Sequence, residues 1–96
     1  MGITRIVKMT FKTEHIKDFE TFYLTIKDKV ADQPGCNGVK LLKEQNNTGV
    51  FFTYSTWDSV EALNAYRQTE TFGKIWPTVK NWFSSKAQAW TVDELM

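Results

Sequence analysis

The sequence has 96 residues, enough for one domain over residues 1–96, and its 12 basic and 11 acidic residues leave a net charge of +1. No five like charges follow one another, no apolar stretch reaches the roughly 18 residues of a membrane span, and the N-terminal residues alternate instead of forming a signal peptide. With a single cysteine as well, the sequence predicts a cytoplasmic protein with no internal disulfide, no nucleic-acid partner and no membrane association.

Residues 3–12 alternate between apolar and polar side chains, a pattern that predicts a strand. Its apolar face consists of Ile3, Val7, Met9 and Phe11, with Arg5 as the exception. Thr13 follows as an expected helix cap, because apolar residues then recur at helical spacing from Ile16 to Val30. The Pro34-Gly35 sequence is expected to end this helix, since the residue before a proline disfavours helical geometry.

The next segment predicts a hairpin. Val39–Gln45 and Val50–Trp57 are the expected strands, and the Asn- and Gly-containing sequence 46–49 between them is typical of a hairpin turn. One face of the strand Val50–Trp57 carries Val50, Phe52 and Tyr54, and its other face carries Phe51, Thr53, Ser55 and Trp57. Because both faces carry bulky apolar residues, we expect this strand to be covered on both sides.

The C-terminal third of the chain predicts two helical pieces and a strand. Asp58 is expected to open the helical region, with Glu61 placed as in a capping box. A break is expected near residues 69–71, and Pro77 also argues against one continuous helix because proline fits only early in a helix or at a kink. Residues 87–95 are expected to form the last strand, which carries Trp90.

The expected order of elements is β-α-β-β-α-β, that of a ferredoxin-like α+β domain with a four-stranded antiparallel sheet and both helices on one face. The other face of the sheet is also predicted to be apolar, and a second copy of the chain is its simplest cover. Aromatic residues make up 15% of the sequence, a surplus that indicates such an interface or an apolar ligand pocket. We therefore expect a homodimer formed through the sheet faces.

Several short motifs along the chain form a recognisable pattern. They are Pro34-Gly35-Cys36 with Gly38, the strand ending Tyr54-Ser55-Thr56-Trp57, the segment from Trp57 to Leu63, Tyr66, and Thr71-Phe72-Gly73-Lys74. This pattern resembles the antibiotic biosynthesis monooxygenase family, and with the first strand and helix in register the resemblance covers nearly the whole chain. It implies a single domain of that type over residues 1–96, folded as a dimeric α+β barrel.

The resemblance also implies an activity. Some members of the family oxidise polycyclic phenols or related aromatics with molecular oxygen and without a metal or flavin. This chain would then be a cofactor-independent monooxygenase, an oxidoreductase acting on a small aromatic or quinone-like substrate. Such chemistry needs an apolar pocket and one or two donors for the substrate oxyanion. It does not need paired acids, a phosphate-binding loop or a metal-ligand motif, and the sequence contains none of these.

Candidate site residues follow from the resemblance and from residue chemistry. Trp57 matches a tryptophan whose indole N–H can donate to the substrate, and Thr53 stands where some members have an asparagine. The only histidine, His15, is either a base at the pocket mouth or a solvent-facing residue of the first helical turn. The remaining residues expected in the substrate pocket are aromatic: Tyr23, Tyr54, Tyr66, Phe72 and Trp76.

Departures from the family pattern leave other functions open. Thr53, and Leu63 in place of an aromatic residue, favour a non-catalytic small-molecule-binding or stress-related dimer as an alternative. An isomerase of the same fold is a third hypothesis, which would require His15 or a tyrosine to face the pocket. Haem degradation is not expected. The related haem-degrading branch of the family has a Trp and an iron-ligating His at the positions that hold Tyr66 and Trp76 here, and an indole N–H cannot ligate iron.

Overall fold

The computed structural model describes residues 2–96. In this part of the chain, four strands and three α-helices follow one another in the order β-α-β-β-α-α-β. The strands are β1 (Ile3–Phe11), β2 (Cys36–Lys43), β3 (Val50–Trp57) and β4 (Phe83–Val92). The helices are a short 3-10 turn, η1 (Thr13–His15), and the α-helices α1 (Ile16–Ala31), α2 (Val60–Arg67) and α3 (Glu70–Lys80).

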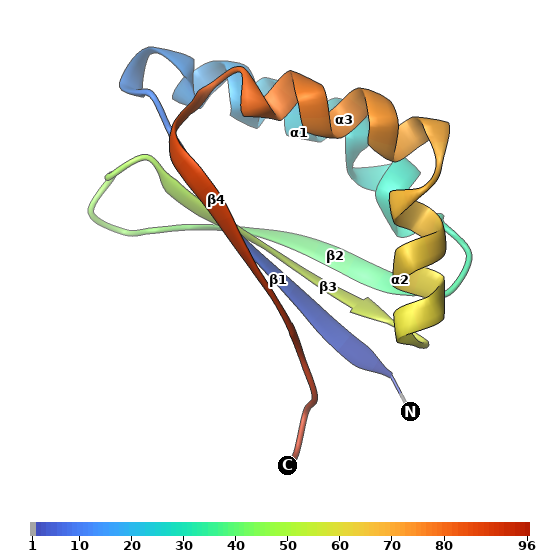
Figure 1. Cartoon of the computed structure of the whole chain (residues 1–96). Helices are drawn as coiled ribbons and strands as arrows, with labels where there is room; N and C mark the ends of the chain where they lie inside the picture. The colour runs from blue at the N-terminus through green and yellow to red at the C-terminus, as the bar shows by residue number, and fades with distance from the viewer. Residues whose placement is uncertain (1) are drawn as a thin grey trace.

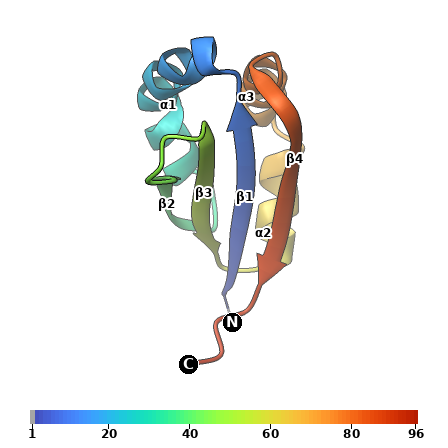
Figure 2. The ribbon, with the colours of Figure 1, turned by 90° about the vertical axis from the view of Figure 1, so that its left-hand side faces the viewer.

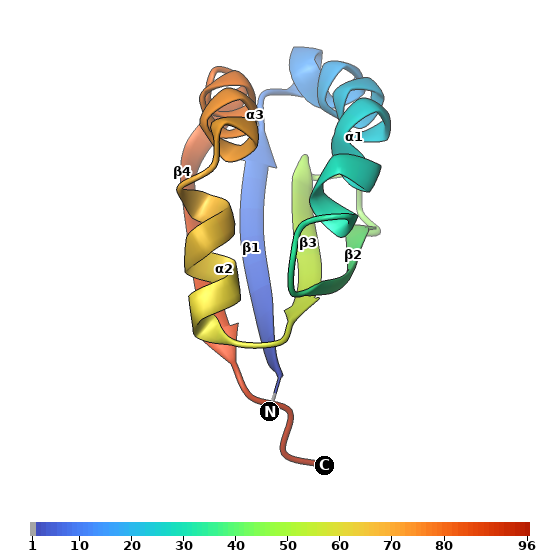
Figure 3. The same ribbon diagram turned by 90° about the vertical axis from the view of Figure 1, so that its right-hand side faces the viewer.

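The strands form one antiparallel sheet in the spatial order β2-β3-β1-β4, and the helices pack over one of its faces (Figures 1 and 3). Figure 2 views the sheet from the opposite side, where no helix of residues 2–96 covers it. The predicted ferredoxin-like α+β fold is therefore confirmed. Side chains alternate along a strand, so odd-numbered residues of β1 and β3 point toward the helices and even-numbered ones toward the bare face.

Two strands begin earlier than predicted. β2 begins at Cys36, which pairs with Trp57 of β3, and β4 begins at Phe83, which pairs with Phe11 of β1. The apolar alternation that predicted these strands is weak over their first residues, which contain Asn37 and a run of polar side chains after Phe83. Backbone pairing to the neighbouring strand, which the sequence pattern does not reveal, sets these boundaries.

The helix starts also differ from the prediction in two places. Thr13 lies inside η1 and does not cap α1, which begins after His15 without a side-chain cap. At α2, the capping residue is Ser59 and not Asp58: the Ser59 hydroxyl accepts a hydrogen bond from the Ala62 N–H at 3.1 Å. A serine at this position satisfies one of the four free amides of the first turn as well as an aspartate would.

The predicted break in the second helical region is confirmed, and it does not involve the proline. α2 ends at Arg67, and Thr69 caps α3 by accepting from the Phe72 N–H at 3.2 Å. Pro77 lies inside α3 on its exposed side, deeper in the helix than expected. There the backbone hydrogen bond that proline cannot donate is open to replacement by water.

The turn before β2 packs against the start of α2. Gly35 adopts a φ of +81°, and a Cβ at this position would lie 2.5 Å from the Cβ of Ala62. The Gly35 carbonyl also accepts a hydrogen bond from the Asp58 N–H at 2.8 Å. Only glycine fits both the backbone conformation and the close approach, so this turn holds the first residues of α2 close to the start of β2.

The core consists of two neighbouring clusters. The larger one joins α1 and α3 to the sheet around Phe11, Phe19 and Phe51, whose rings stack or meet edge to face. The smaller one joins α2 to the end of β3 around Trp57 and Tyr66. Residues of both clusters contribute to the wall of one cavity, which lies where the two clusters meet.

Candidate functional site

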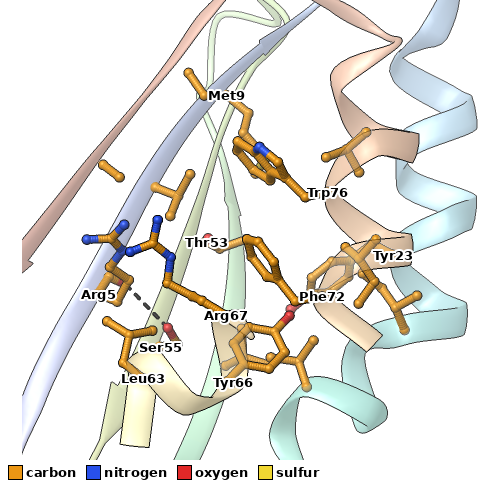
Figure 4. A pocket seen from close by; sticks show the side chains of 18 of the residues that line it. Arg5, Met9, Tyr23, Thr53, Ser55, Leu63, Tyr66, Arg67, Phe72 and Trp76 are labelled. Atoms are coloured by element: carbon orange, nitrogen blue, oxygen red, sulfur yellow. Dashed lines mark hydrogen bonds between the residues drawn. The ribbon is translucent and has the colours of Figure 1, made fainter. Parts of the chain in front are cut away.

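A cavity of about 360 Å³ lies between the helices and the helix-covered face of the sheet (Figure 4). Side chains from β1, β3 and β4 form its floor, and α1, α2 and α3 supply the opposite walls. The lining is mainly apolar and includes Val7, Met9, Phe19, Ile26, Leu63 and Val79. Cavities of this size and character bind small apolar molecules when a few polar groups are placed to orient them.

One wall of the cavity is a row of aromatic rings. Trp57 stacks on Tyr66 with ring centroids 5.3 Å apart and planes 25° apart. Tyr66 meets Phe72 edge to face at 5.3 Å, and Phe72 stacks on Trp76 at 6.1 Å. These spacings fall in the range where aromatic pairs stabilise each other beyond simple burial. Because the planes of Tyr66 and Phe72 are 82° apart, the row forms an angled apolar wall against which an aromatic ligand can pack.

Two tyrosine hydroxyls are available to donate hydrogen bonds in the cavity. Tyr23 from α1 and Tyr66 from α2 both line it, and Figure 4 shows their rings reaching into the same part of the space. Burial, with a smaller contribution from Cys36, raises the pKa of Tyr66 to about 12. Burial also raises the pKa of Tyr23. Both phenols therefore stay protonated at neutral pH and can serve as donors to an oxyanion.

The floor of the cavity carries two more hydroxyls, on β3. Thr53 lines the cavity, and its hydroxyl makes no hydrogen bond to another group of residues 2–96. Ser55, two residues later on the same face, is buried and accepts a hydrogen bond from the indole Nε1 of Trp57 at 3.0 Å. The Trp57 N–H, which the sequence predicts as a substrate donor, is therefore occupied in this conformation.

Two arginines that were not among the predicted site residues also line the cavity. Arg5 extends from β1 and Arg67 from the last turn of α2. Arg5 donates from Nη1 to the Thr91 hydroxyl at 2.8 Å, and burial, together with the nearby charge of Arg67, lowers the pKa of Arg5. The sequence does contain a signal for Arg5, because it is the one charged residue on the apolar face of the first strand.

The structure brings most of the predicted site residues together and separates two from them. Tyr23, Thr53, Trp57, Tyr66, Phe72 and Trp76 all line the cavity. Tyr54 does not, because it points to the bare face of the sheet, one residue out of phase with Thr53. His15 lies at the start of α1, where its Nδ1 is 2.9 Å from Asp18 Oδ2 and its ring stacks on Trp82 at 6.2 Å.

Within residues 2–96, no group of three or more His, Cys, Asp or Glu side chains is arranged to hold a metal ion. The helices in this range are also too short or too polar to span a bilayer.

Proteins of known structure share this fold over nearly their whole length. An antibiotic biosynthesis monooxygenase has a TM-score of 0.90 at 21% identity, with 98% of this chain and 99% of that chain covered. A conserved protein from Methanosarcina mazei has a TM-score of 0.92 at 15% identity, covering 99% and 94% of the two chains. Rv0793 from Mycobacterium tuberculosis has a TM-score of 0.90 at 11% identity, covering 100% and 97%. At these identities the likeness shows the fold alone.

Sequence comparison gives the family. No curated protein matches the chain significantly in sequence. The family model described as antibiotic biosynthesis monooxygenase matches residues 2–76, a range that runs from β1 into α3 and contains most of the cavity lining. The chain therefore belongs to the antibiotic biosynthesis monooxygenase family.

Proposed function

We propose that the protein is a cofactor-independent monooxygenase that oxidises a small phenol or hydroquinone bound in the cavity. The observation that carries this proposal is the combination of an aromatic wall with hydroxyl donors in one space of about 360 Å³. That volume lies at the lower end of the roughly 300–1,000 Å³ typical of small-molecule sites, so it favours a compact substrate of a few fused rings.

In the proposed reaction the substrate supplies the electrons. Its phenolate gives one electron to molecular oxygen, and the two radicals join at a ring carbon that carries a hydrogen. The resulting peroxide anion takes back from solvent the proton that the phenol had lost, which gives a hydroperoxide. Loss of water from this hydroperoxide leaves a quinone. One oxygen atom of O₂ enters the product, the other leaves as water, and O₂ is the only oxidant required. The protein must desolvate the phenolate, hold its oxygen with donors and keep the ring in place.

The residues of the cavity are suited to those tasks. The row from Trp57 to Trp76 offers an apolar aromatic wall against which the substrate ring can pack. The hydroxyls of Tyr66, Tyr23 and Thr53 are the proposed donors to the substrate oxygen, because they line the same space and the tyrosines stay protonated at neutral pH. Donors placed in advance in a water-poor site stabilise developing negative charge strongly.

Trp57 has a different place in this proposal from the donor role that the family resemblance implies, whereas His15 has the second of its two expected places, in the first helical turn and outside the cavity. With its N–H donated to Ser55, the buried Trp57 ring stacks on Tyr66 and supports the position of that ring in the wall. A direct donor role for Trp57 would require this hydrogen bond to break. His15 has no role in the proposed chemistry, because its ring packs against Trp82 and its nitrogen contacts Asp18 outside the cavity.

Oxygen uptake with a panel of anthrones, naphthols and hydroquinones tests the proposal. We expect uptake above the uncatalysed rate for at least one compound, and a decrease on the order of 100-fold in Tyr66→Phe, the size of effect seen when one oxyanion donor is removed. Tyr54→Phe is the matched control, because it deletes the same hydroxyl on the other face of the sheet. Trp57→Phe separates the two hypotheses for that residue: a loss as large as in Tyr66→Phe would restore the donor role. Uptake at the uncatalysed rate across the panel would contradict the proposal.

The alternative is a binder that holds an aromatic molecule without changing it. One observation favours it: no imidazole or carboxylate side chain of residues 2–96 lines the cavity, so no side chain there is suited to take a proton from a neutral phenol. The same observation disfavours an isomerase, since Tyr66 with its raised pKa is a poor base. Saturable binding of a panel compound without product formation would support the binder.

The assembly we propose is a homodimer joined through the bare face of the sheet. This face carries a continuous apolar strip across three strands, in which Ile6 of β1 pairs with Tyr54 on one side and with Trp90 on the other. Leu42 and Trp90 are 46% and 44% exposed in the single chain. Contiguous exposed apolar surface of this kind is typical of protein interfaces.

A further inference from the structure

Within residues 2–96, every charged side chain that lines the cavity is a cation. They are Arg5 and Arg67, and no Asp or Glu side chain joins them in the lining. Neither guanidinium forms a salt bridge within residues 2–96. The one hydrogen bond that engages an Arg5 side-chain donor goes to the neutral hydroxyl of Thr91. An arginine has five N–H donors, so most of the donors of Arg5 are left for a ligand.

The two guanidiniums also lie close enough to act on each other. Burial lowers the pKa of Arg5, and the charge of Arg67 lowers it further. Figure 4 shows both groups together on the side of the cavity formed by β1 and α2, and the ring of Tyr23 on the opposite side. No acidic side chain of residues 2–96 pairs with these two like charges, so a bound anion would relieve their mutual repulsion.

We propose that Arg5 and Arg67 select aromatic ligands that carry a carboxylate. The carboxylate binds between the two guanidiniums, whose planar donor forks match its two oxygens, and the ring lies against Tyr66 and Phe72. This inference rests on the proposed use of the cavity for small aromatic molecules, and it adds the substrate class.

The position of Arg67 makes such binding energetically reasonable. It lies in the exposed last turn of α2, so a carboxylate beside it keeps part of its hydration while the ring is buried. A carboxylate placed at the tyrosine end would lose that hydration without gaining a cation, which is costly. The arrangement therefore fixes the orientation of the ligand. Its carboxylate points toward β1 and the end of α2, and its ring points toward the aromatic wall.

Calorimetric titration with 2-naphthoate and 2-naphthamide tests the inference. The two compounds have the same shape and differ in charge, and neither is a phenol, so no turnover is required. We expect the acid to bind about tenfold more tightly than the amide at low salt, the effect of one or two charge-assisted hydrogen bonds. Equal affinity, tighter binding of the amide, or no binding of either compound would overturn the inference.

Variants assign the preference to the two arginines. Arg67→Gln, on the exposed side of α2, should remove most of the acid preference and leave amide binding unchanged. Arg5→Gln should do the same, and its melting temperature shows whether the fold is kept. Lys80→Gln, which removes one positive charge from an exposed site outside the cavity, should keep the full preference. A preference that persists in Arg67→Gln or disappears in Lys80→Gln would overturn the assignment.

The outcome is separable from that of the proposed oxygenation. If the protein binds 2-naphthoate more tightly than 2-naphthamide but takes up no oxygen with any phenol, the proposed ligand class is correct and the proposed reaction is wrong. Oxygen uptake from a neutral phenol, with no preference for 2-naphthoate, would leave the reaction correct and the ligand class wrong.

Discussion

The indole Nε1 of Trp57 donates a hydrogen bond to the hydroxyl of Ser55 at 3.0 Å. The two residues are two apart on β3 and therefore share the face of the sheet that lines the cavity. Trp57 is only 1% exposed, so its N–H needs a partner inside the protein. Ser55 supplies that partner and fixes the orientation of the ring on which Tyr66 stacks.

Replacing Ser55 tests this relationship. Ser55→Ala leaves the buried indole N–H without an acceptor, so the free energy of unfolding should decrease by about 1–3 kcal/mol. Urea denaturation followed by tryptophan fluorescence measures the loss. Ser85→Ala, an exposed serine on β4, is the control and should change stability little. Equal losses in the two variants would show that Ser55 does not anchor Trp57.

The raised pKa of Tyr66 predicts a pH dependence of stability. In the unfolded chain the phenol loses its proton near pH 10, and in the folded protein only near pH 12, because burial disfavours the phenolate. Between these values the unfolded state binds fewer protons than the folded state, so stability contributed by Tyr66 is complete below pH 10 and is lost as the pH rises to 12. Urea denaturation from pH 8 upward should show a smaller decline in Tyr66→Phe than in Tyr54→Phe. Identical declines would contradict the assignment.

Two glycines should respond in opposite directions to alanine. Gly35 has a φ of +81°, and its added Cβ would meet Ala62 at 2.5 Å, so Gly35→Ala should destabilise the protein by about 1–3 kcal/mol. Gly73 lies exposed inside α3, where an added Cβ would meet no atom within 4 Å beyond its chain neighbours and the helix's own backbone, and Gly73→Ala should stabilise by about 0.5–1 kcal/mol. Thermal denaturation of both variants checks the pair. A Gly35→Ala variant with unchanged thermal stability would show that the close packing of this turn against α2 does not contribute to stability.

The proposed homodimer can be tested with a matched pair of surface changes. Trp90→Asp places a charge on the bare face of the sheet, where it should convert the dimer to a monomer. Leu24→Asp makes a similar change on the exposed side of α1, where Leu24 is 66% exposed, and should leave the dimer intact. Sedimentation velocity at micromolar concentration distinguishes the states. A monomeric wild type, or monomers from both variants, would contradict the interface.

Much of the fold could be predicted because it depends on local patterns. Alternation over β1 and β3, the helical spacing of apolar residues in α1, and the turn at Pro34-Gly35 each act within a few residues. The boundaries of β2 and β4 could not be predicted in this way, since they depend on pairing with Trp57 and Phe11, far along the chain. The choice of Ser59 over Asp58 as the cap depends on the local path of the backbone.

Most of the candidate site could be predicted from the family resemblance and from the chemistry of the aromatic residues, while strand phase explains why Tyr54 lies outside it. Thr53 was predicted from the family resemblance, and Tyr66 and Trp76 as aromatic pocket residues; all three line the cavity. Two features of the site could be seen only in the three-dimensional structure. One is the hydrogen bond that the Trp57 N–H donates to the Ser55 hydroxyl. The other is the meeting of Arg5 from β1 with Arg67 from α2, which no sequence spacing predicts because the two residues lie on different elements.

Isotope labelling is the most direct test of the proposed oxygenation by O₂. The substrate found in the oxygen-uptake panel is incubated with the protein under ¹⁸O₂ in unlabelled water, and the product mass is measured. The account predicts one labelled oxygen atom per product molecule, formed faster with wild type than with Tyr66→Phe. Product that carries no label, or that forms at the same rate without the protein, would contradict it.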